Sequence, residues 1–168
     1  YIQGGGNYFS TPAEYSGGIV TVNPSTHAVN LLMDDGATYG NITGMVLVNA
    51  DKGYFIGYAG WGDNTVYDFS PTTGVVGDAV SDELSGINIA GMQSGAYVDD
   101  NNMLWVCDQT NAEVVIVDTT DDSIDERLST NLNPLMVVFT SEGEAGSGSS
   151  SSSDNGCFIG SIFSGIFK

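Results

Sequence analysis

The sequence predicts an all-β fold built from a repeated unit of four short antiparallel strands, the blade of a β-propeller. A strand–turn–strand segment recurs three times, at spacings of 47 residues (Asn23 to Ser70) and 48 residues (Ser70 to Asp118). Alternating apolar and polar residues within it are typical of half-buried strands. The 23 glycines, with many Asn, Asp and Ser, suit tight turns. Four-stranded units at this period indicate propeller blades, and a β-sandwich is the competing fold.

The recurring segment aligns without gaps in three stretches of the chain, which are 19–29 (IVTVNPSTHAV), 66–76 (VYDFSPTTGVV) and 114–124 (VVIVDTTDDSI). Each reads as an alternating strand, a turn rich in Pro, Thr or Asp, and a second strand. His27 lies in the first of these turns and aligns with Gly74 and Asp121. We therefore expect an exposed turn histidine and not a catalytic base.

Two further strands precede the segment in the second and third units. They are 44–48 and 54–57, joined by the turn 49–53, and 95–98 and 103–107, joined by the turn 99–102. One unit is thus four strands in sequence order. Cys107 ends a strand of core residues, so we expect it to pack as a small hydrophobe. A disulfide with Cys157 is the alternative.

The two ends of the repeat are complementary. Residues 1–3 match 55–57 and 105–107, so the chain opens at the second strand of a unit. Residues 134–139 match 43–48, so the body closes with a lone first strand, suited to cover the open edge of the opening sheet. Three units are fewer than the roughly four to eight blades of a closed ring. Either further blades precede Tyr1 in a longer polypeptide, which the missing start signals favour, or two copies build one six-bladed ring.

Charge excludes several classes of function. The 168 residues include 3 Lys and Arg against 21 Asp and Glu, a formal charge of −18. Such a chain cannot neutralise phosphates, so neither nucleic acid nor anionic lipid is an expected partner. With one His and two Cys, the chain also lacks the ligands of a His/Cys metal site. No apolar run reaches the length of a membrane span.

The C-terminal part differs in composition from the body. We expect blades over 1–140, a Ser/Gly-rich flexible linker over 141–156 and a hydrophobic tail over 157–168. On a helix the bulky apolar side chains of the tail share one face, whereas small residues fill the other. The candidate attachment residues are Cys157, Phe158, Ile159, Ile162, Phe163, Ile166 and Phe167. The tail is expected to bind a partner or a surface, and the simpler alternative is a tail that folds back onto the body.

Part of the repeat resembles the YVTN/NHL-type β-propeller superfamily, in its secreted or surface-layer branch. The residues that carry the resemblance are 104–108 (LWVCD), 114–118 (VVIVD) and Asn133-Pro134, while Tyr1-Ile2-Gln3 and Phe55-Ile56-Gly57 depart from the usual Val-Thr-Asn. The resemblance implies a propeller over 1–140 that serves mostly as a binding scaffold, with some lactonases among relatives.

The tail carries a second resemblance. The Ser-rich linker followed by Cys157-Phe158-Ile159 is similar to the C-terminal Cys-Phe-Ile box of secreted bacterial proteins, although the usual continuation is replaced by Gly160-Ser161-Ile162-Phe163. The resemblance implies a sorting or anchoring signal, and hence an extracellular or cell-surface bacterial protein.

One rim of the predicted propeller is a candidate ligand-binding face. In such a fold, the connections between second and third strands share a face with those that lead to the next unit. Aromatic rings beside carboxylates and amides there suit a carbohydrate, peptide or protein ligand, although turns need the same polar residues anyway. The candidate residues are Tyr8, Phe9, Tyr15, Tyr39, Trp61, Asp63 and Asp108.

Acidic pairs are candidates for structural Ca²⁺ because oxygen atoms are its ligands. These residues are Asp34, Asp35, Asp99 and Asp100. None has EF-hand spacing, so solvated hairpin turns are the simpler interpretation. We expect no other cofactor.

These patterns favour a non-enzymatic, extracytoplasmic scaffold for binding or assembly, tethered through its tail to a protein or cell-surface partner, to other copies of itself or to upstream blades. The sequence has no G-x-S-x-G motif and no second His for a catalytic dyad. The alternative is a metal-dependent hydrolase or lactonase with carboxylates at the centre of the ring.

Overall fold

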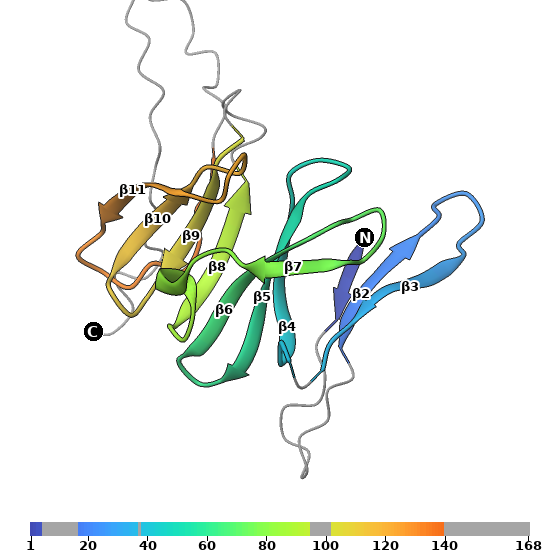
Figure 1. Ribbon diagram of the computed structural model, residues 1–168, viewed down its shortest axis with the longest axis horizontal. Coiled ribbons are helices and arrows are strands. Elements are labelled where there is room, and N and C mark those ends of the chain that lie inside the picture. The colour runs from blue at the N-terminus through green and yellow to red at the C-terminus, as the bar shows by residue number, and fades with distance from the viewer. Residues whose placement is uncertain (5–16, 37, 95–101, 140–168) are drawn as a thin grey trace, which may run out of the picture.

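The computed structural model describes residues 1–4, 17–36, 38–94 and 102–139, and these residues form three antiparallel β-sheets (Figure 1). One short 3-10 turn, η1 (Asp82–Leu84), is the only helical element within these ranges. The predicted all-β class is therefore confirmed. The tail and the linker lie outside the described residues.

Each sheet is built from strands that are consecutive in the chain and pair with their sequence neighbours. The first sheet contains β1 (Ile2–Gly4), β2 (Gly18–Val22) and β3 (Val29–Asp34). The second contains β4 (Asn41–Leu47), β5 (Gly53–Gly60), β6 (Asp63–Phe69) and β7 (Val76–Ala79). The third contains β8 (Ile89–Ser94), β9 (Leu104–Asp108), β10 (Glu113–Val117) and β11 (Ile124–Ser129).

The same turn joins the last two strands of every sheet. In the first sheet Asn23 N donates a hydrogen bond to Ala28 O at 2.9 Å, and His27 N donates one to Asn23 O at 2.8 Å. The second sheet repeats this pair of bonds at Ser70 and Gly74, and the third at Asp118 and Asp122. The repeat in the sequence is therefore a repeat in the structure.

One position in each of these turns has a left-handed backbone. The φ angles are 58° at His27, 73° at Gly74 and 63° at Asp122. The third equivalent of His27 is thus Asp122, and the expected match with Asp121 was wrong by one residue. Glycine adopts this conformation without strain, whereas other residues do so at a cost.

The register of the second strands also corrects the sequence alignment. Ile2 pairs with Val20, Phe55 with Tyr67 and Val106 with Val115, so Ile2 corresponds to Phe55 and not to Ile56. Since Tyr54, Phe55 and Ile56 are all apolar, alternation along β5 could not fix the register. All three are buried because the second sheet has a neighbour on each side.

The core lies in layers between the sheets. The cluster between the first and second sheets contains Ile19, Met33, Ile42, Phe55 and Phe69. The cluster between the second and third sheets contains Val46, Tyr54, Ile56, Val66, Leu84, Ile89, Leu104, Val106, Val115 and Val117. The second sheet therefore contributes its two opposite faces to two successive layers.

The three sheets lie closest together at their first strands and diverge toward their last strands. Their first strands lie together, because β4 contacts both β1 and β8. The backbones of the outer strands β3, β7 and β11 lie farther from the neighbouring sheets, although the Met33 side chain of β3 reaches the layer between the first and second sheets. Figure 1 shows β11 and β3 at opposite sides of the molecule, with β7 between them.

Residues 134–139 lie against the far face of the third sheet and do not pair with β1 of the same chain. Val137 is buried with Cys107 and Val114, and the ring of Phe139 meets that of Trp105 edge-on, with centroids 5.5 Å apart. Val138 forms an isolated bridge, so the expected continuous strand is absent here. The expected pairing beside the opening strand does not occur within one chain, because the second and third sheets separate this segment from β1.

Candidate functional site

The turns between second and third strands meet the connections between sheets at one end of the molecule. Asn64 N donates a hydrogen bond to Ile87 O at 2.8 Å, and Gln109 N donates one to Asn88 O at 2.9 Å. The Asn88 side chain in turn donates to the Gln109 side chain at 2.9 Å. On this part of the candidate rim, hydrogen bonds thus link the hairpins of the second and third sheets to the connection between these sheets.

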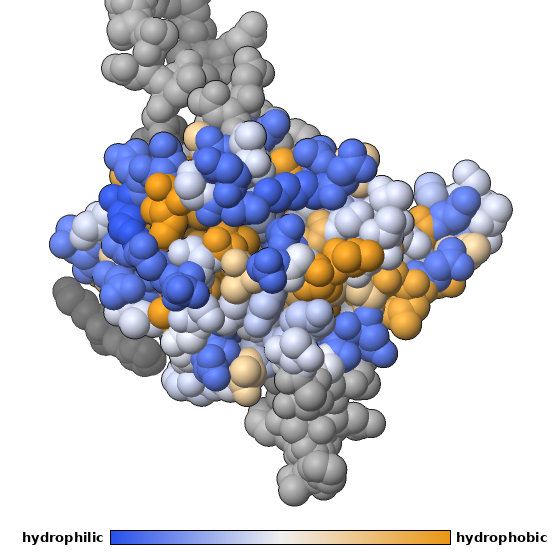
Figure 2. Space-filling model, in the orientation of Figure 1, coloured by the Kyte–Doolittle hydropathy of each residue, from blue (hydrophilic) through white to orange (hydrophobic). Residues whose placement is uncertain are grey.

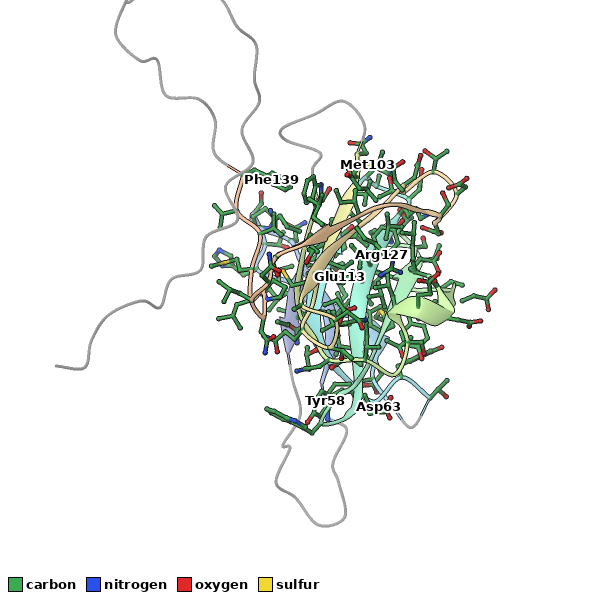
Figure 3. All side chains as sticks on the ribbon, turned by 90° about the vertical axis from the view of Figure 1, so that its left-hand side faces the viewer. Tyr58, Asp63, Met103, Glu113, Arg127 and Phe139 are labelled. Carbon is green, nitrogen blue, oxygen red and sulfur yellow. The ribbon has the colours of Figure 1, made fainter. Side chains whose placement is uncertain are left out.

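Trp61 is an almost fully exposed candidate residue on this rim. It lies at the tip of the β5–β6 hairpin with 91% of its surface accessible. Asp63 follows on the same hairpin and is also exposed, and Figure 3 shows it at the tip with Tyr58. A solvent-exposed indole next to a carboxylate is suited to stack on an apolar or sugar-like surface.

Tyr39 and Asp108, by contrast, contact other residues of the protein, in packing and in a turn. The Tyr39 ring packs edge-on against Phe55 and Tyr67, with centroids 5.8 and 5.2 Å away. Asp108 is fully buried and accepts hydrogen bonds from Asn111 N at 3.1 Å and Asn111 Nδ2 at 2.7 Å. Tyr8, Phe9 and Tyr15 lie outside the described residues.

The calcium candidates Asp34 and Asp35 follow one another at the end of β3. Asp35 Oδ2 accepts a hydrogen bond from Gly17 N at 2.8 Å, whereas Oδ1 is buried without a partner. Burial, and then the nearby Asp34 carboxylate, raise the pKa of Asp35. Across the described ranges, no three His, Cys, Asp or Glu side chains gather in a way that could hold a metal ion. Asp99 and Asp100 lie outside these ranges.

A cluster of charged and polar groups that the sequence pattern did not predict joins the second and third sheets. Lys52 Nζ donates to Asp122 Oδ2 at 2.8 Å and to Thr119 O at 2.8 Å. The fully buried Tyr54 donates its hydroxyl proton to Asp122 Oδ1 at 2.5 Å. We call Lys52, Tyr54 and Asp122 the inter-sheet clasp. The sequence offers one signal for it: with 3 Lys and Arg against 21 Asp and Glu, each cation is expected to pair with a nearby carboxylate.

The electrostatics of the clasp favour a neutral tyrosine. Burial, the bond to Asp122 and the carboxylates of Asp68 and Asp118 all raise the pKa of Tyr54. Burial, and then the charge of Asp122, raise the pKa of Asp68, while Lys52 opposes the shift. The positive charge of Lys52 thus offsets the negative charges that gather where the second and third sheets meet. The clasp thereby holds these two sheets together.

Arg127 forms a second ionic group, on the outer strand of the third sheet. It pairs with Glu113 on the neighbouring strand and with Glu83 in η1, and Figure 3 shows Arg127 near Glu113. Lys52 and Arg127 are the two Lys or Arg residues in the described ranges, so both hold structural elements together.

Cys107 has the role expected of a small core residue. It is fully buried beside Val114 and Val137, and its thiol is free. Burial raises the pKa of this thiol to about 11, which suppresses the reactive thiolate.

Two apolar surfaces lie at the opposite ends of the row of sheets. The first-sheet face is the side of β1–β3 that points away from the second sheet; it consists of Ile2, Val20, Val22, Val29 and Leu31. The closing-segment surface consists of Leu132, Leu135, Met136 and Val138, which are between 49% and 60% exposed. Figure 2 shows apolar residues gathered around β3.

Both of these end surfaces lack charge in a strongly acidic chain. Residues 17–33 and 128–139 contain no Asp, Glu, Lys or Arg. Ile2, Val29 and Leu31 are each more than half exposed. Uncharged, apolar patches at defined places are typical of surfaces that bind another protein.

Comparisons with protein-family models, with curated proteins and with solved structures found no match to this chain. Among the described residues, no helix has the length and apolar character needed to cross a membrane.

Proposed function

We propose that this chain is a non-catalytic assembly scaffold of β-propeller type that acts outside the cell or at its surface. The observation that carries the proposal is the pair of uncharged apolar end surfaces on a chain with a formal charge of −18. Burying such surfaces against another β-structure gains hydrophobic free energy without bringing carboxylates together.

The arrangement of the sheets supports a propeller as the complete structure. The first strands of neighbouring sheets contact each other, and every sheet turns back through the same bonds at His27, Gly74 and Asp122. Repeated sheets that converge on their first strands and diverge at their last are arranged as blades around an axis. The end surfaces are then the places where the next blades would pack.

The ionic groups support a scaffold more than an enzyme. The inter-sheet clasp is built around a fully buried tyrosine, and Arg127 is held between two glutamates. These groups bridge sheets and strands, so their charges serve the packing of the repeat. Trp61, on the rim, is the side chain best placed to contact a ligand of this scaffold.

The tail supplies the proposed attachment to a surface. Its apolar residues, among them Phe158, Ile162 and Phe163, follow a linker long enough to separate it from the body. With the Cys-Phe-Ile resemblance, this pattern supports sorting to the outside of a bacterial cell.

Fractionation of the natural material tests the scaffold proposal. The full chain is compared with a Leu31→Glu/Met136→Glu variant, which places charge on both end surfaces, and with a Val75→Glu control on an exposed turn of the second sheet. We expect the parent and the control in large assemblies, and the double variant as free protein with unchanged β circular dichroism. A double variant that stays assembled like the parent would contradict the proposal.

A further inference from the structure

We propose that residues 134–139 of one copy form the fourth strand of the first sheet in a second copy. The two chains would then pack head to tail, with the closing-segment surface of one against the first sheet of the other. This inference rests on the proposed assembly function and names the partner as a second copy of the chain.

The first sheet has one strand fewer than the others among the described residues. β1 pairs with β2 on one edge only, whereas the equivalent strands β5 and β9 are each flanked by two strands. The additional partners are β4 and β8, the first strands of the second and third sheets. An unpaired edge presents free N–H and C=O groups, which pair readily with another strand.

Residues 134–139 have the sequence and the place of such a first strand. The segment Ile42-Thr-Gly-Met45 lies near the start of β4, and Ile89-Ala-Gly-Met92 lies at the start of β8. Asn133-Pro-Leu-Met136 follows β11 and shares the methionine of these segments. β4 packs onto the first sheet and β8 onto the second through Ile42 and Ile89. In the same way, the later segment packs onto the third sheet.

The contacts of residues 134–139 with the third sheet confirm that position. An added Cβ on Gly91 in β8 would lie 3.0 Å from Leu135 O, so the two backbones are close. Val137 contributes to the cluster on the outer face of the third sheet. This segment is thus the beginning of a fourth layer, for which the same chain supplies no further strands among its described residues.

Side-chain directions set the register of the proposed pairing. Met45 lies opposite Phe55 and Met92 opposite Val106, and each pair faces the preceding sheet. Val137 faces the preceding sheet in the same sense and is buried, whereas Met136 is half exposed. Val137, and not the aligned Met136, therefore takes the place of these methionines, a shift of one residue from the sequence alignment. Its partner in the second copy is then Ile2, since cross-strand partners share a face.

This register places Met136 opposite Gln3, and Val138 opposite Tyr1, on the other face of the completed sheet. Met136 and Val138 are about half exposed in one chain and would become covered. The first-sheet face of the second copy, with Ile2 and Leu31, would meet the outer face of the third sheet. The first-sheet face and residues 128–139 contain no charged residue, so this part of the contact avoids the repulsion that two copies of charge −18 exert elsewhere. Glu126, opposite Ile116 on the outer face of the third sheet, is a carboxylate at the border of the contact.

Disulfide trapping between two full-length chains tests this register. One chain carries Gln3→Cys and the other Met136→Cys, both in a Cys157→Ser background that removes the tail thiol. Directly opposed residues on paired strands bring their Cβ atoms close enough for a disulfide after small adjustment. The matched control mixes the Gln3→Cys chain with Val75→Cys, an exposed site on the second sheet.

We expect a covalent dimer in the first mixture at a yield about tenfold above the control, because a disulfide forms only between cysteines whose Cβ atoms lie close together. A second pair, Tyr1→Cys with Val138→Cys, repeats the test at an independent position in case one substitution impairs folding. Equal yields in test and control mixtures, or no dimer from either pair of folded chains, would overturn the proposal. If charging the end surfaces still releases the protein from its natural assembly, the scaffold function stands and only the identity of the partner is wrong.

Discussion

The hydroxyl of Tyr54 in the second sheet donates a 2.5 Å hydrogen bond to Asp122 in a turn of the third sheet. The two residues are 68 positions apart, and Lys52 completes the clasp by pairing with the same carboxylate at 2.8 Å. Asp122 also has the left-handed conformation that closes its own turn. One residue therefore serves both the repeated turn and the packing of two sheets.

Removal of the Tyr54 hydroxyl should destabilise the protein. Tyr54→Phe leaves Asp122 without one of its partners in a partly buried site, which costs about 1–3 kcal/mol. Urea unfolding followed by circular dichroism measures this loss. The control is Tyr67→Phe, which removes a hydroxyl from the neighbouring strand of the same sheet. If the two variants lose equal stability, the Tyr54 hydrogen bond to Asp122 does not contribute specifically to holding the two sheets together.

Neutralising Asp68 should stabilise the protein at neutral pH. The pKa of Asp68 is raised in the folded state, so the folded state binds its proton more tightly than the unfolded state does. Stability from this group is therefore present at low pH and is lost as pH rises through the folded pKa. We expect Asp68→Asn to raise the urea midpoint at pH 7, and this gain to shrink near pH 3 (below the ordinary pKa of about 3.9). A gain that is independent of pH would contradict the electrostatic explanation.

The repeated turn predicts opposite effects at two equivalent positions. Gly74→Ala places a Cβ 2.1 Å from Leu32 O in a left-handed backbone, and we expect a loss above about 1 kcal/mol. His27→Gly relieves the same conformation at an exposed position, and should leave stability unchanged or raise it by up to about 1 kcal/mol. Thermal unfolding of both variants measures these changes. A strongly destabilised His27→Gly variant would show that the histidine has another role.

Cys107 should react with thiol reagents only when the protein unfolds. Its pKa of about 11, against 9.0 for a free thiol, lowers the thiolate fraction at pH 8 about a hundredfold, and burial blocks access as well. Labelling of the Cys157→Ser variant by Ellman's reagent, with and without urea, measures the difference. Rapid labelling of the folded protein would mean that the contact of Val137 with Cys107 opens readily.

The apolar tail should attach the protein to its natural surface. Replacing Phe158, Ile162 and Phe163 with Ser removes much of its apolar area and should shift the full chain from the particulate to the soluble fraction. Circular dichroism should still show the β structure of the body. A matched variant with Ser152, Ser153 and Asp154 changed to Gly retains the tail and should remain attached. Equal attachment of the two variants would rule out a tethering role.

The strands and their turns could be predicted because their signals are local. The alternation of apolar and polar residues predicted the third strand of each unit, and Asn23, Ser70 and Asp118 indicated the turns that follow these strands. The register of β5 could not be predicted, since its residues are apolar on both faces. Burial, in turn, depends on the neighbouring sheet and not on the strand's own pattern.

The candidate site was less predictable, because its polar residues have partners far along the chain. Lys52 and Asp122 are 70 positions apart, and no spacing rule connects them. Asp108 seemed suited to a ligand but closes a turn with Asn111, and Tyr39 packs with Phe55. Trp61 and Asp63, at a hairpin tip, were predictable because a two-residue turn exposes its side chains.

Sedimentation equilibrium of the purified full chain at increasing salt tests the central claim most directly. Two copies of charge −18 repel each other, and salt screens this repulsion while leaving the apolar contact intact. We predict a species of twice the 17.5 kDa chain mass, with association that strengthens between about 0.05 M and about 0.5 M NaCl. A single species of 17.5 kDa at every salt and protein concentration would contradict it.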